Sequence, residues 1–193
     1  MKDEGNTKFQ QIVKTATDLF MRYGYSRVTI EEICQTSNVS KMTFYKHFSN
    51  KIDLILYIIG KIANEAIAEY QRIMQGDILY SEKVKKIIRM KIKQGESYSR
   101  ELYSDLMQNP VPEVQEYIEK LQQENIERVT NDLKNAQEKG EIRSDLKPEL
   151  IIYILNKMTD WTKDDELLDM FDDLSELTSE VMNFFFYGIL PRH

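Results

Sequence analysis

The 193-residue chain has a single cysteine, Cys34, so it cannot form a disulfide within itself. Its two histidines, His47 and His193, are too few to build a Cys/His zinc cluster around that thiol. A chain of this length buries a core without cross-links, and the lone thiol is typical of a reducing, cytoplasmic compartment. The sequence therefore predicts neither a metal site nor another cofactor.

Glycine and proline are scarce, with 7 and 4 residues, and long stretches contain neither. Sheet proteins use these residues in their turns, so the scarcity favours an all-α fold. The longest apolar runs, 54–60 and 184–190, are far shorter than the roughly 20 residues that span a bilayer. The N-terminus also lacks the basic and then apolar pattern of a secretory signal. We expect no association with a membrane.

The net charge of −6 is unevenly distributed along the chain. The first 56 residues contain eight Lys or Arg against six acids, a net charge of +2, so the remainder carries −8. Between Glu32 and Asp53 there is no acidic residue. Three lysines recur within this gap at five-residue spacing: Lys41, Lys46 and Lys51. This segment can approach phosphate while the acidic remainder stays away from nucleic acid.

Helical periodicity and capping signals predict three short helices near the N-terminus, over 7–23, 30–36 and 41–47. Thr29 and Glu32 form a capping box at the start of the second helix. Asn38 tolerates the left-handed conformation of a tight turn, and Ser40 caps the third helix. Two short helices joined by such a turn, with a third completing the core, can place a helix in the major groove.

Longer helical patterns follow, from 51 to Gly76 and over about 81–107, 113–139, 148–161 and 166–187. Asn50 and Asp53 form a cap-like pair at the start of the first of these helices. There is no low-complexity linker, so we expect the two parts of the chain to share the long helix that starts at 51 rather than to be joined by a flexible tether.

The third predicted helix has one apolar face and one face suited to nucleic acid. Phe44 and Phe48 lie one turn apart and are expected to pack in the core with Val39, rather than to stack on bases. The side chains that then project outward are Lys41, Met42, Thr43, Tyr45, Lys46 and His47. Lysines and hydroxyls reach base edges or phosphates, and the Met or Thr methyl can touch the thymine methyl.

Residues 8–57 resemble the DNA-binding domain of the TetR family of repressors. The matching residues are Ala16, Leu19, Phe20, Gly24, Tyr25, Thr29, Ile30, Ile33, Val39, Ser40, Lys41, Thr43, Phe44, Tyr45, His47, Phe48, Asn50 and Lys51. The resemblance implies that the six outward residues face the groove, that Thr29 and Ser40 lie near the DNA backbone, and that Lys51 grips a phosphate. Asn38 replaces the usual turn glycine and Cys34 a small alanine. Glu31 could repel phosphate and is left out of the site.

The resemblance also implies an organisation and a function. Residues 1–48 would form the helix-turn-helix DNA-binding domain, and residues 49–193 a larger antiparallel helical domain for effector binding and dimerisation. The protein would be a cytoplasmic homodimer and not an enzyme. It would regulate transcription, as a repressor released from a near-palindromic, double-stranded DNA operator by a small-molecule effector.

Several alternatives remain beside these expectations. The protein could be a helical enzyme, although no nucleophile elbow, phosphate loop or paired-histidine motif is present. It could also be a helical protein-interaction module, or bind a small molecule without binding DNA. Cys34 could be a redox sensor, but a buried inert thiol fits its apolar helix face better. His47 suits phosphate contact or packing better than catalysis.

Three further groups of residues admit both a functional and an ordinary structural interpretation. The acidic run between Asp164 and Asp173 lacks the glycine turn of a calcium loop, which favours a solvated helix start. Five large side chains could line an effector pocket or simply form core: Tyr98, Tyr103, Met107, Met158 and Trp161. The last two helices carry apolar residues that could form a dimer interface: Ile151, Leu155, Met158, Leu174, Leu177, Val181, Phe184, Phe185 and Tyr187.

Overall fold

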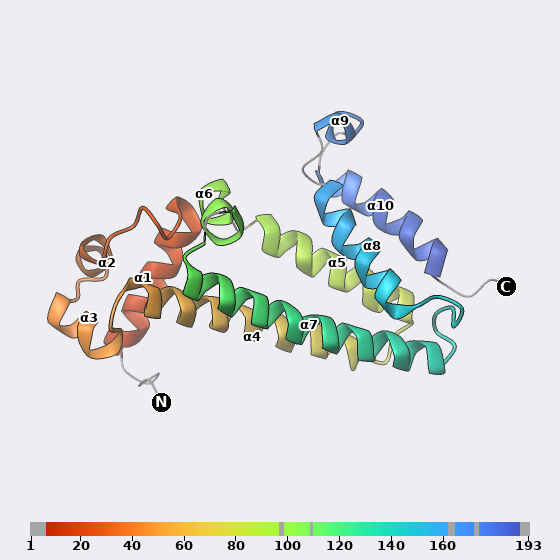
Figure 1. The fold of residues 1–193 in the computed structure, drawn as a ribbon, viewed down its shortest axis with the longest axis horizontal. Coiled ribbons are helices and arrows are strands. Elements are labelled where there is room, and N and C mark those ends of the chain that lie inside the picture. Colours follow the sequence, from red (N-terminus) through yellow and green to blue (C-terminus); the bar gives the residue numbers. More distant parts are fainter. Residues whose placement is uncertain (1–6, 97–98, 109, 162–164, 172–173, 190–193) are drawn as a thin grey trace. The chain divides into compact units, whose positions relative to one another are not determined.

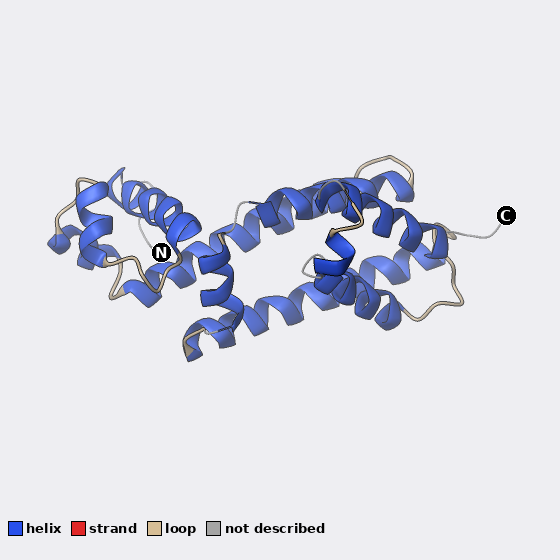
Figure 2. Cartoon of the chain, turned by 90° about the horizontal axis from the view of Figure 1, so that it is seen from above, coloured by secondary structure: helices blue, strands red, loops and turns tan. Residues whose placement is uncertain are grey.

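A computed structural model describes residues 7–96, 99–108, 110–161, 165–171 and 174–189 of the chain. Every regular element in these ranges is a helix (Figure 2), which confirms the predicted all-α fold. In the same ranges, no helix combines the length and the apolar character that crossing a bilayer requires.

The N-terminal elements are α1 (Thr7–Tyr23), α2 (Ile30–Thr36), α3 (Lys41–His47) and the long α4 (Lys51–Met74) (Figure 1). The remaining elements are α5 (Tyr80–Glu96), α6 (Arg100–Tyr103), the π-helical turn η1 (Ser104–Gln108), α7 (Pro112–Glu138), α8 (Pro148–Trp161), α9 (Asp165–Leu168) and α10 (Leu174–Ile189). The first three helices begin and end at the predicted residues.

The prediction of one helix over 81–107 is wrong, because α5, α6 and η1 replace it. The backbone N–H of Ser99 donates to the Met21 carbonyl at 3.1 Å instead of to a helical partner. The Ser99 hydroxyl then accepts a hydrogen bond from the Leu102 N–H at 3.0 Å, so it caps the next helical turn. Gly95 disfavours helix in the last turn of α5, and the serine cap starts a new helical turn, so α5 ends at Glu96 although hydrophobic periodicity alone would continue it.

The final predicted helix, over 166–187, is also wrong as a single element, since α9 ends at Leu168 and α10 begins at Leu174. Between them the Met170 N–H donates to the Leu167 carbonyl at 3.2 Å, a turn bond rather than a continued α-helix. The intervening sequence is rich in aspartate, which has low helix propensity but suits a helix start.

The chain divides into two compact units, which we call unit 1 (residues 1–71 and 93–121) and unit 2 (residues 72–92 and 122–193). Three helices, α4, α5 and α7, contribute residues to both units. These units are defined by packing. The boundary predicted from the sequence, between residues 48 and 49, separates the DNA-binding domain from the domain for effector binding and dimerisation. That functional boundary stays a prediction.

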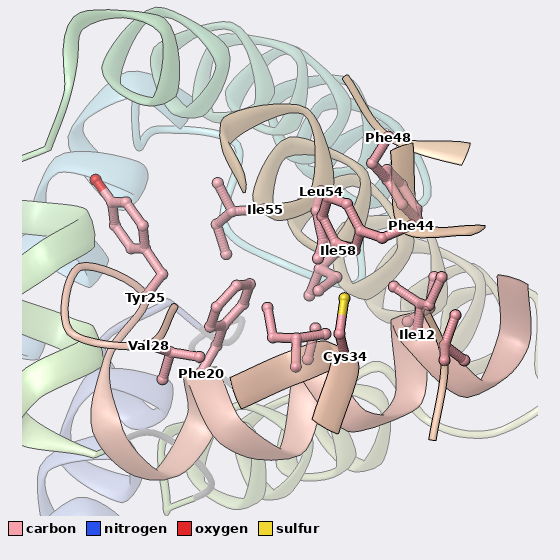
Figure 3. Close-up of a cluster of buried hydrophobic side chains, with 14 of the residues drawn as sticks. Ile12, Phe20, Tyr25, Val28, Cys34, Phe44, Phe48, Leu54, Ile55 and Ile58 are labelled. Carbon is pink, nitrogen blue, oxygen red and sulfur yellow. The ribbon is translucent and has the colours of Figure 1, made fainter. Parts of the chain in front are cut away.

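The core of unit 1 joins α1, α2 and α3 to the first turns of α4 (Figure 3). Phe44 and Phe48 are fully buried, as predicted. The Phe9 ring stacks on Phe48 with centroids 5.3 Å apart. Leu54 and Ile55 of α4 complete the cluster, so the first three helices are fixed to the long helix by apolar contacts.

Cys34 lies within this core, with its sulfur among apolar side chains (Figure 3). Burial raises the pKa of the Cys34 thiol, which disfavours the reactive thiolate. The predicted burial is confirmed, and both observations favour the inert interpretation over a redox sensor.

Unit 2 has a separate core built from α5, α7, α8 and α10. Its buried residues are Tyr80, Leu133, Ala136, Ile142, Ile151, Phe185 and Ile189. The connection between α7 and α8 closes this core: the Arg143 N–H donates to the Ile189 carbonyl at 2.9 Å, and its Nη1 donates to the Gly188 carbonyl at 3.0 Å. The end of α10 is therefore tied to the loop that precedes α8.

Candidate nucleic-acid interface

Local capping bonds position the two helices of the candidate motif. The Thr29 hydroxyl accepts from the Glu32 N–H at 3.2 Å, and the Glu32 carboxylate accepts from the Thr29 N–H at 2.7 Å, so the predicted capping box is present. Asn38 adopts φ 53° in the turn between α2 and α3, the left-handed conformation expected there. The Ser40 hydroxyl caps α3 by accepting from the Thr43 N–H at 3.1 Å.

The outward face of α3 agrees with the sequence prediction at four of its six positions and partly at two. Met42 and Tyr45 are 69% and 55% exposed, large values for apolar or aromatic side chains. Lys41 and Lys46 are also exposed. Thr43 and His47 are half-buried. The helix therefore presents cationic, aromatic and thioether groups to solvent while Phe44 anchors it from behind.

Three of the hydroxyls proposed from sequence, those of Thr29, Ser40 and Thr43, are already engaged within the subunit. The Thr29 hydroxyl lies 2.9 Å from the Glu32 carboxylate, to which it donates. The Ser40 and Thr43 hydroxyl oxygens are 2.9 Å apart and share a hydrogen bond. Thr29 and Ser40 thus shape the helix starts first, and a DNA contact would use their remaining lone pairs or require rearrangement.

His47 packs against the first helix. Its ring meets Phe9 edge-on, with centroids 5.6 Å apart. This contact supports the packing role that the sequence left open, and leaves the phosphate contact a prediction. In the described part of the chain, no three His, Cys, Asp or Glu side chains are grouped closely enough to hold a metal ion.

Glu31, which sequence reasoning left out of the site, forms an exposed ion pair with Lys41. The hydrogen bond from Lys41 lowers the pKa of Glu31, and the same bond raises the pKa of Lys41. The two residues are ten positions apart on different helices, so no local spacing rule could reveal the pair. One of the candidate base-contacting cations is therefore already held by an acid on α2.

Lys51 does more than present a charge to solvent. Its Nζ donates to the carbonyls of Ser26 and Val28, both at 2.9 Å, and so ties the start of α4 to the loop between α1 and α2. Burial lowers the pKa of Lys51, against the opposing influence of Asp105 and Glu32. An ammonium has three donors, which leaves one for the phosphate contact that the sequence predicts.

We expect Lys51→Met to affect stability and DNA binding together. Losing two charged hydrogen bonds should cost about 1–3 kcal/mol of unfolding free energy, measured by urea denaturation. Binding to all duplexes should weaken alike, because a phosphate contact carries no sequence information. Lys46→Met, at an exposed position, is the matched control and should leave the unfolding free energy within about 0.5 kcal/mol of wild type. Equal stability of the two variants would contradict the tethering role.

The loop between α1 and α2 is also held by a residue that sequence reasoning missed. The carboxylate of Asp105, in η1, accepts from the Ser26 N–H at 2.9 Å. Gly24 has φ 77°, and a side-chain carbon there would lie 2.5 Å from the same carboxylate oxygen. The Tyr25 hydroxyl accepts from the Val111 N–H at 3.3 Å. Segments near residues 105 and 111 thus fix the loop that leads into the helix-turn-helix.

Of the effector-pocket candidates proposed from sequence, Tyr98 lies outside the described residues, and the structure describes only the backbone of Tyr103, Met107, Met158 and Trp161. That prediction stays untested.

The fold and this site define a helix-turn-helix DNA-binding regulator. Residues 12–58 match the family model described as "Bacterial regulatory proteins, tetR family". Over these residues the chain is similar to the TetR family, which agrees with the sequence resemblance.

Curated relatives agree with this assignment. The chain is 24% identical to the HTH-type transcriptional regulator UidR of Escherichia coli over 164 residues, which cover 82% of this chain and 81% of UidR. It is 39% identical to the uncharacterized HTH-type transcriptional regulator YerO of Bacillus subtilis over 64 residues, 31% of this chain and 22% of YerO. These relatives are transcriptional regulators rather than enzymes.

Solved structures share the fold over most of its length. FadR from Bacillus subtilis in complex with stearoyl-CoA superposes with a TM-score of 0.73 at 19% identity, covering 92% of this chain and 97% of FadR. A transcriptional regulator from Saccharomonospora viridis in complex with choline gives 0.76 at 15% identity, covering 95% and 97%. At these identities the likeness concerns the fold alone.

Proposed function

We propose that this protein is a cytoplasmic, homodimeric repressor that leaves a near-palindromic operator when a small molecule binds its larger helical domain. The observation that carries the proposal is the two-faced α3, with Phe44 fully buried behind exposed Met42, Tyr45 and Lys46. An exposed cationic helix that is rigidly anchored from behind suits insertion into the major groove.

Two kinds of contact are assigned to the interface. Lys41, Met42, Thr43 and Lys46 read base edges, since ammonium, hydroxyl and methyl groups discriminate bases in the major groove. The residues assigned to backbone contacts are Thr29, Ser40, Tyr45, His47 and Lys51. Two such interfaces about 34–36 Å apart would meet successive turns of one duplex, which is why the operator is expected to be a near-palindrome.

The proposed dimer uses the outer faces of α8 and α10. Tyr153 is 61% exposed and Phe184 83% exposed, and Leu150 on α8 is exposed as well. A second copy covering these side chains would remove apolar surface from water. Of the candidates chosen from sequence, Ile151, Leu177 and Phe185 are instead buried within their own subunit, so they cannot form the outer surface. For Met158, Leu174 and Tyr187 the structure describes only the backbone.

We propose that effector binding changes the affinity for DNA through the loop between α1 and α2, around residues 24–28. Asp105 and Lys51 hold this loop from two sides, and the loop enters α2 directly. A ligand that favours one arrangement of the larger domain would shift η1 and thereby the recognition helix. Only a difference in ligand affinity between the DNA-binding and released states produces this effect.

The test is selection of bound fragments from the source genome, followed by titration of the enriched duplex at several salt concentrations. With about six to eight phosphates contacted per dimer, log affinity should fall with log salt at a slope of about −0.9 per phosphate. Failure to retard any fragment at low salt would favour a protein-interaction module or a ligand-binding protein without DNA binding. Turnover of a small molecule in a broad screen would favour an enzyme.

Base readout can be separated from backbone contact on the selected operator. Lys41→Ala and Thr43→Ala should alter preference at particular base pairs by about 1–3 kcal/mol each. The measurement is competition between operators that differ at single positions. Uniform weakening across all operators would contradict the assignment of these two residues to bases.

The ion pair between Glu31 and Lys41 is expected to limit the affinity for DNA. Glu31→Gln should free the Lys41 ammonium and remove a carboxylate that repels phosphate, so affinity for random duplex should rise several-fold and its salt dependence should steepen by about one contact. Asp18→Asn changes the net charge equally at an exposed position of α1 and is the matched control. If both variants bind random duplex alike, only net charge matters and the pair has no specific role.

A further inference from the structure

Two arginines lie over a single tyrosine ring where α1 passes into the loop before α2. The guanidinium carbons of Arg22 and Arg27 are 5.8 Å and 5.6 Å from the centroid of the Tyr23 ring. At these distances the ring attracts both cations. All three side chains are exposed, and we call them the Tyr23 cluster. Sequence reasoning assigned none of them to the nucleic-acid interface.

The two guanidinium groups of the Tyr23 cluster are available to an anion. Within the described part of unit 1, neither forms a hydrogen bond or an ion pair, although Asp18 precedes Arg22 by one helical turn. Two cations gathered at one ring repel each other, so a nearby anion stabilises the pair. A guanidinium that stacks on a ring keeps the N–H groups at its edge free, and these match the oxygens of a phosphate.

The backbone that carries Arg27 is held in place by its neighbours. Tyr25 and Val28, on either side of Ser26 and Arg27, are buried in the core of unit 1 (Figure 3). The carbonyls of Ser26 and Val28 both accept from Lys51 Nζ at 2.9 Å. Arg27 therefore projects from a fixed loop and stacks on a ring, so little conformational freedom is lost when it binds a partner.

Arg27 also lies next to the residues assigned to the DNA backbone. Lys51 bonds the carbonyls on both sides of Arg27, and Thr29 follows Arg27 within about 7 Å along the chain. The N–H and hydroxyl of Thr29 lower the pKa of Glu32 most, and Arg27 and Lys51 lower it further, so both cations lie near the same carboxylate. That carboxylate is engaged in the capping box, where it accepts from the N–H and hydroxyl of Thr29.

We propose that Arg27, ordered on the Tyr23 ring, binds a backbone phosphate of the duplex beside the phosphate assigned to Lys51. The interface then extends from α3 and the start of α4 onto the loop between α1 and α2. Charge complementarity and continuity with Thr29 and Lys51 favour the DNA backbone as the partner. The inference rests on the proposed function, because it adds a contact to the same interface.

The test is titration of the full chain with a random-sequence duplex and with the selected operator at several salt concentrations. Arg27→Gln should weaken binding to both by about tenfold or more, the size of a charged hydrogen bond. With two copies of the contact per dimer, the slope of log affinity against log salt should become shallower by about 1.8. Arg89→Gln, at an exposed position of α5 in unit 2, is the matched control and should keep the wild-type slope. An unchanged slope in Arg27→Gln overturns the proposal.

Uncharged phosphates locate the contact on the operator. Single phosphates are replaced in turn by methylphosphonates, and each replacement at a contacted position should weaken binding of the wild type. At one position in each half-site the replacement should weaken the wild type but not Arg27→Gln, because the variant has already lost that contact. If the variant responds at every position as the wild type does, Arg27 contacts no phosphate, even where its overall affinity is lower.

Tyr23 is a positioning residue in this proposal, and its variant separates orientation from charge. Tyr23→Leu keeps both arginines, so the salt slope should stay as in wild type. Binding should weaken about two- to fivefold per half-site, the size of an exposed cation–π interaction. Arg27→Lys should also keep the slope, because the charge is retained. Wild-type affinity in Tyr23→Leu overturns the role of the ring.

Thermal melting excludes a merely structural effect. Arg27→Gln should melt as the wild type does, because the side chain is exposed. A variant that melts lower and loses affinity without a change in slope would show that Arg27 supports the fold, which overturns the phosphate contact.

Failure of this inference can be told from failure of the proposed function. If the wild type retards no duplex at low salt, the protein does not bind DNA and both proposals fail. If the wild type binds with a steep salt dependence while Arg27→Gln behaves as Arg89→Gln does, DNA binding stands and only the contact by Arg27 is overturned.

Discussion

Phe184→Asp is expected to convert the protein from dimer to monomer and to weaken operator binding by about 10²–10⁴-fold. The Phe184 side chain is 83% exposed in the subunit, so the substitution leaves the subunit core untouched. In the proposed dimer the same position is buried against the second copy, where an unpaired carboxylate is strongly unfavourable. The loss in affinity follows because two linked heads bind a palindrome far more tightly than one head alone.

The measurement combines light scattering for mass with titration of full and half operators. Affinity for a half operator should hardly change, since each head remains folded. Met170→Asp is the matched control, because Met170 is 67% exposed but lies outside α8 and α10. A Phe184→Asp protein that keeps its dimeric mass at micromolar concentration would contradict the proposed interface.

The bounds of α1, α2 and α3 could be predicted from the sequence because they depend on hydrogen bonds and conformations of neighbouring residues. The caps at Thr29 and Ser40 depend on side chains three residues from the groups they bond, and the turn at Asn38 depends on the left-handed conformation of that one residue. Such bonds are visible in sequence because their spacing is fixed by helix geometry. The alternation between buried Phe44 and exposed Tyr45 follows from the same geometry.

Contacts between distant segments could not be predicted in the same way. Asp105 bonds Ser26 across 79 positions, and Lys51 bonds Val28 across 23. The residues next to Asp105 or Lys51 in the sequence do not reveal these bonds, because any aspartate or lysine near a helix end has similar neighbours. The sequence therefore identified Lys51 as a surface cation and could not show that it also fixes a loop.

Hydrophobic periodicity misled in the larger domain for a related reason. It reports which side chains can face a core, but not whether the backbone between them stays helical. The helix α5 ends at Glu96, and the Ser99 backbone bonds to Met21, a competing partner from another element. The apolar residues near the C-terminus show the same limit, since Phe184 and Phe185 are adjacent yet one is exposed and the other buried.

Phe44→Ala is expected to cost about 3–5 kcal/mol of unfolding free energy, the range for truncating a fully buried aromatic ring. Phe44 has no exposed surface, and its ring lies 5.9 Å from that of Phe48, centroid to centroid. The cavity would open directly behind the recognition helix and remove its anchor to the first turns of α4. Affinity for operator and random duplex should therefore fall together, before any base contact is altered.

Tyr45→Ala is the control for this expectation, because Tyr45 neighbours Phe44 on the same helix but is 55% exposed. Urea denaturation should show a change within about 0.5 kcal/mol for Tyr45→Ala, since surface truncations rarely cost more. The affinity of Tyr45→Ala for the operator should still fall, because the variant loses a contact with the DNA backbone while the protein stays folded. If Tyr45→Ala destabilised the protein as much as Phe44→Ala, the two faces of α3 would have been assigned the wrong way round, and the proposed readout by Lys41, Thr43 and Lys46 would lose its structural basis.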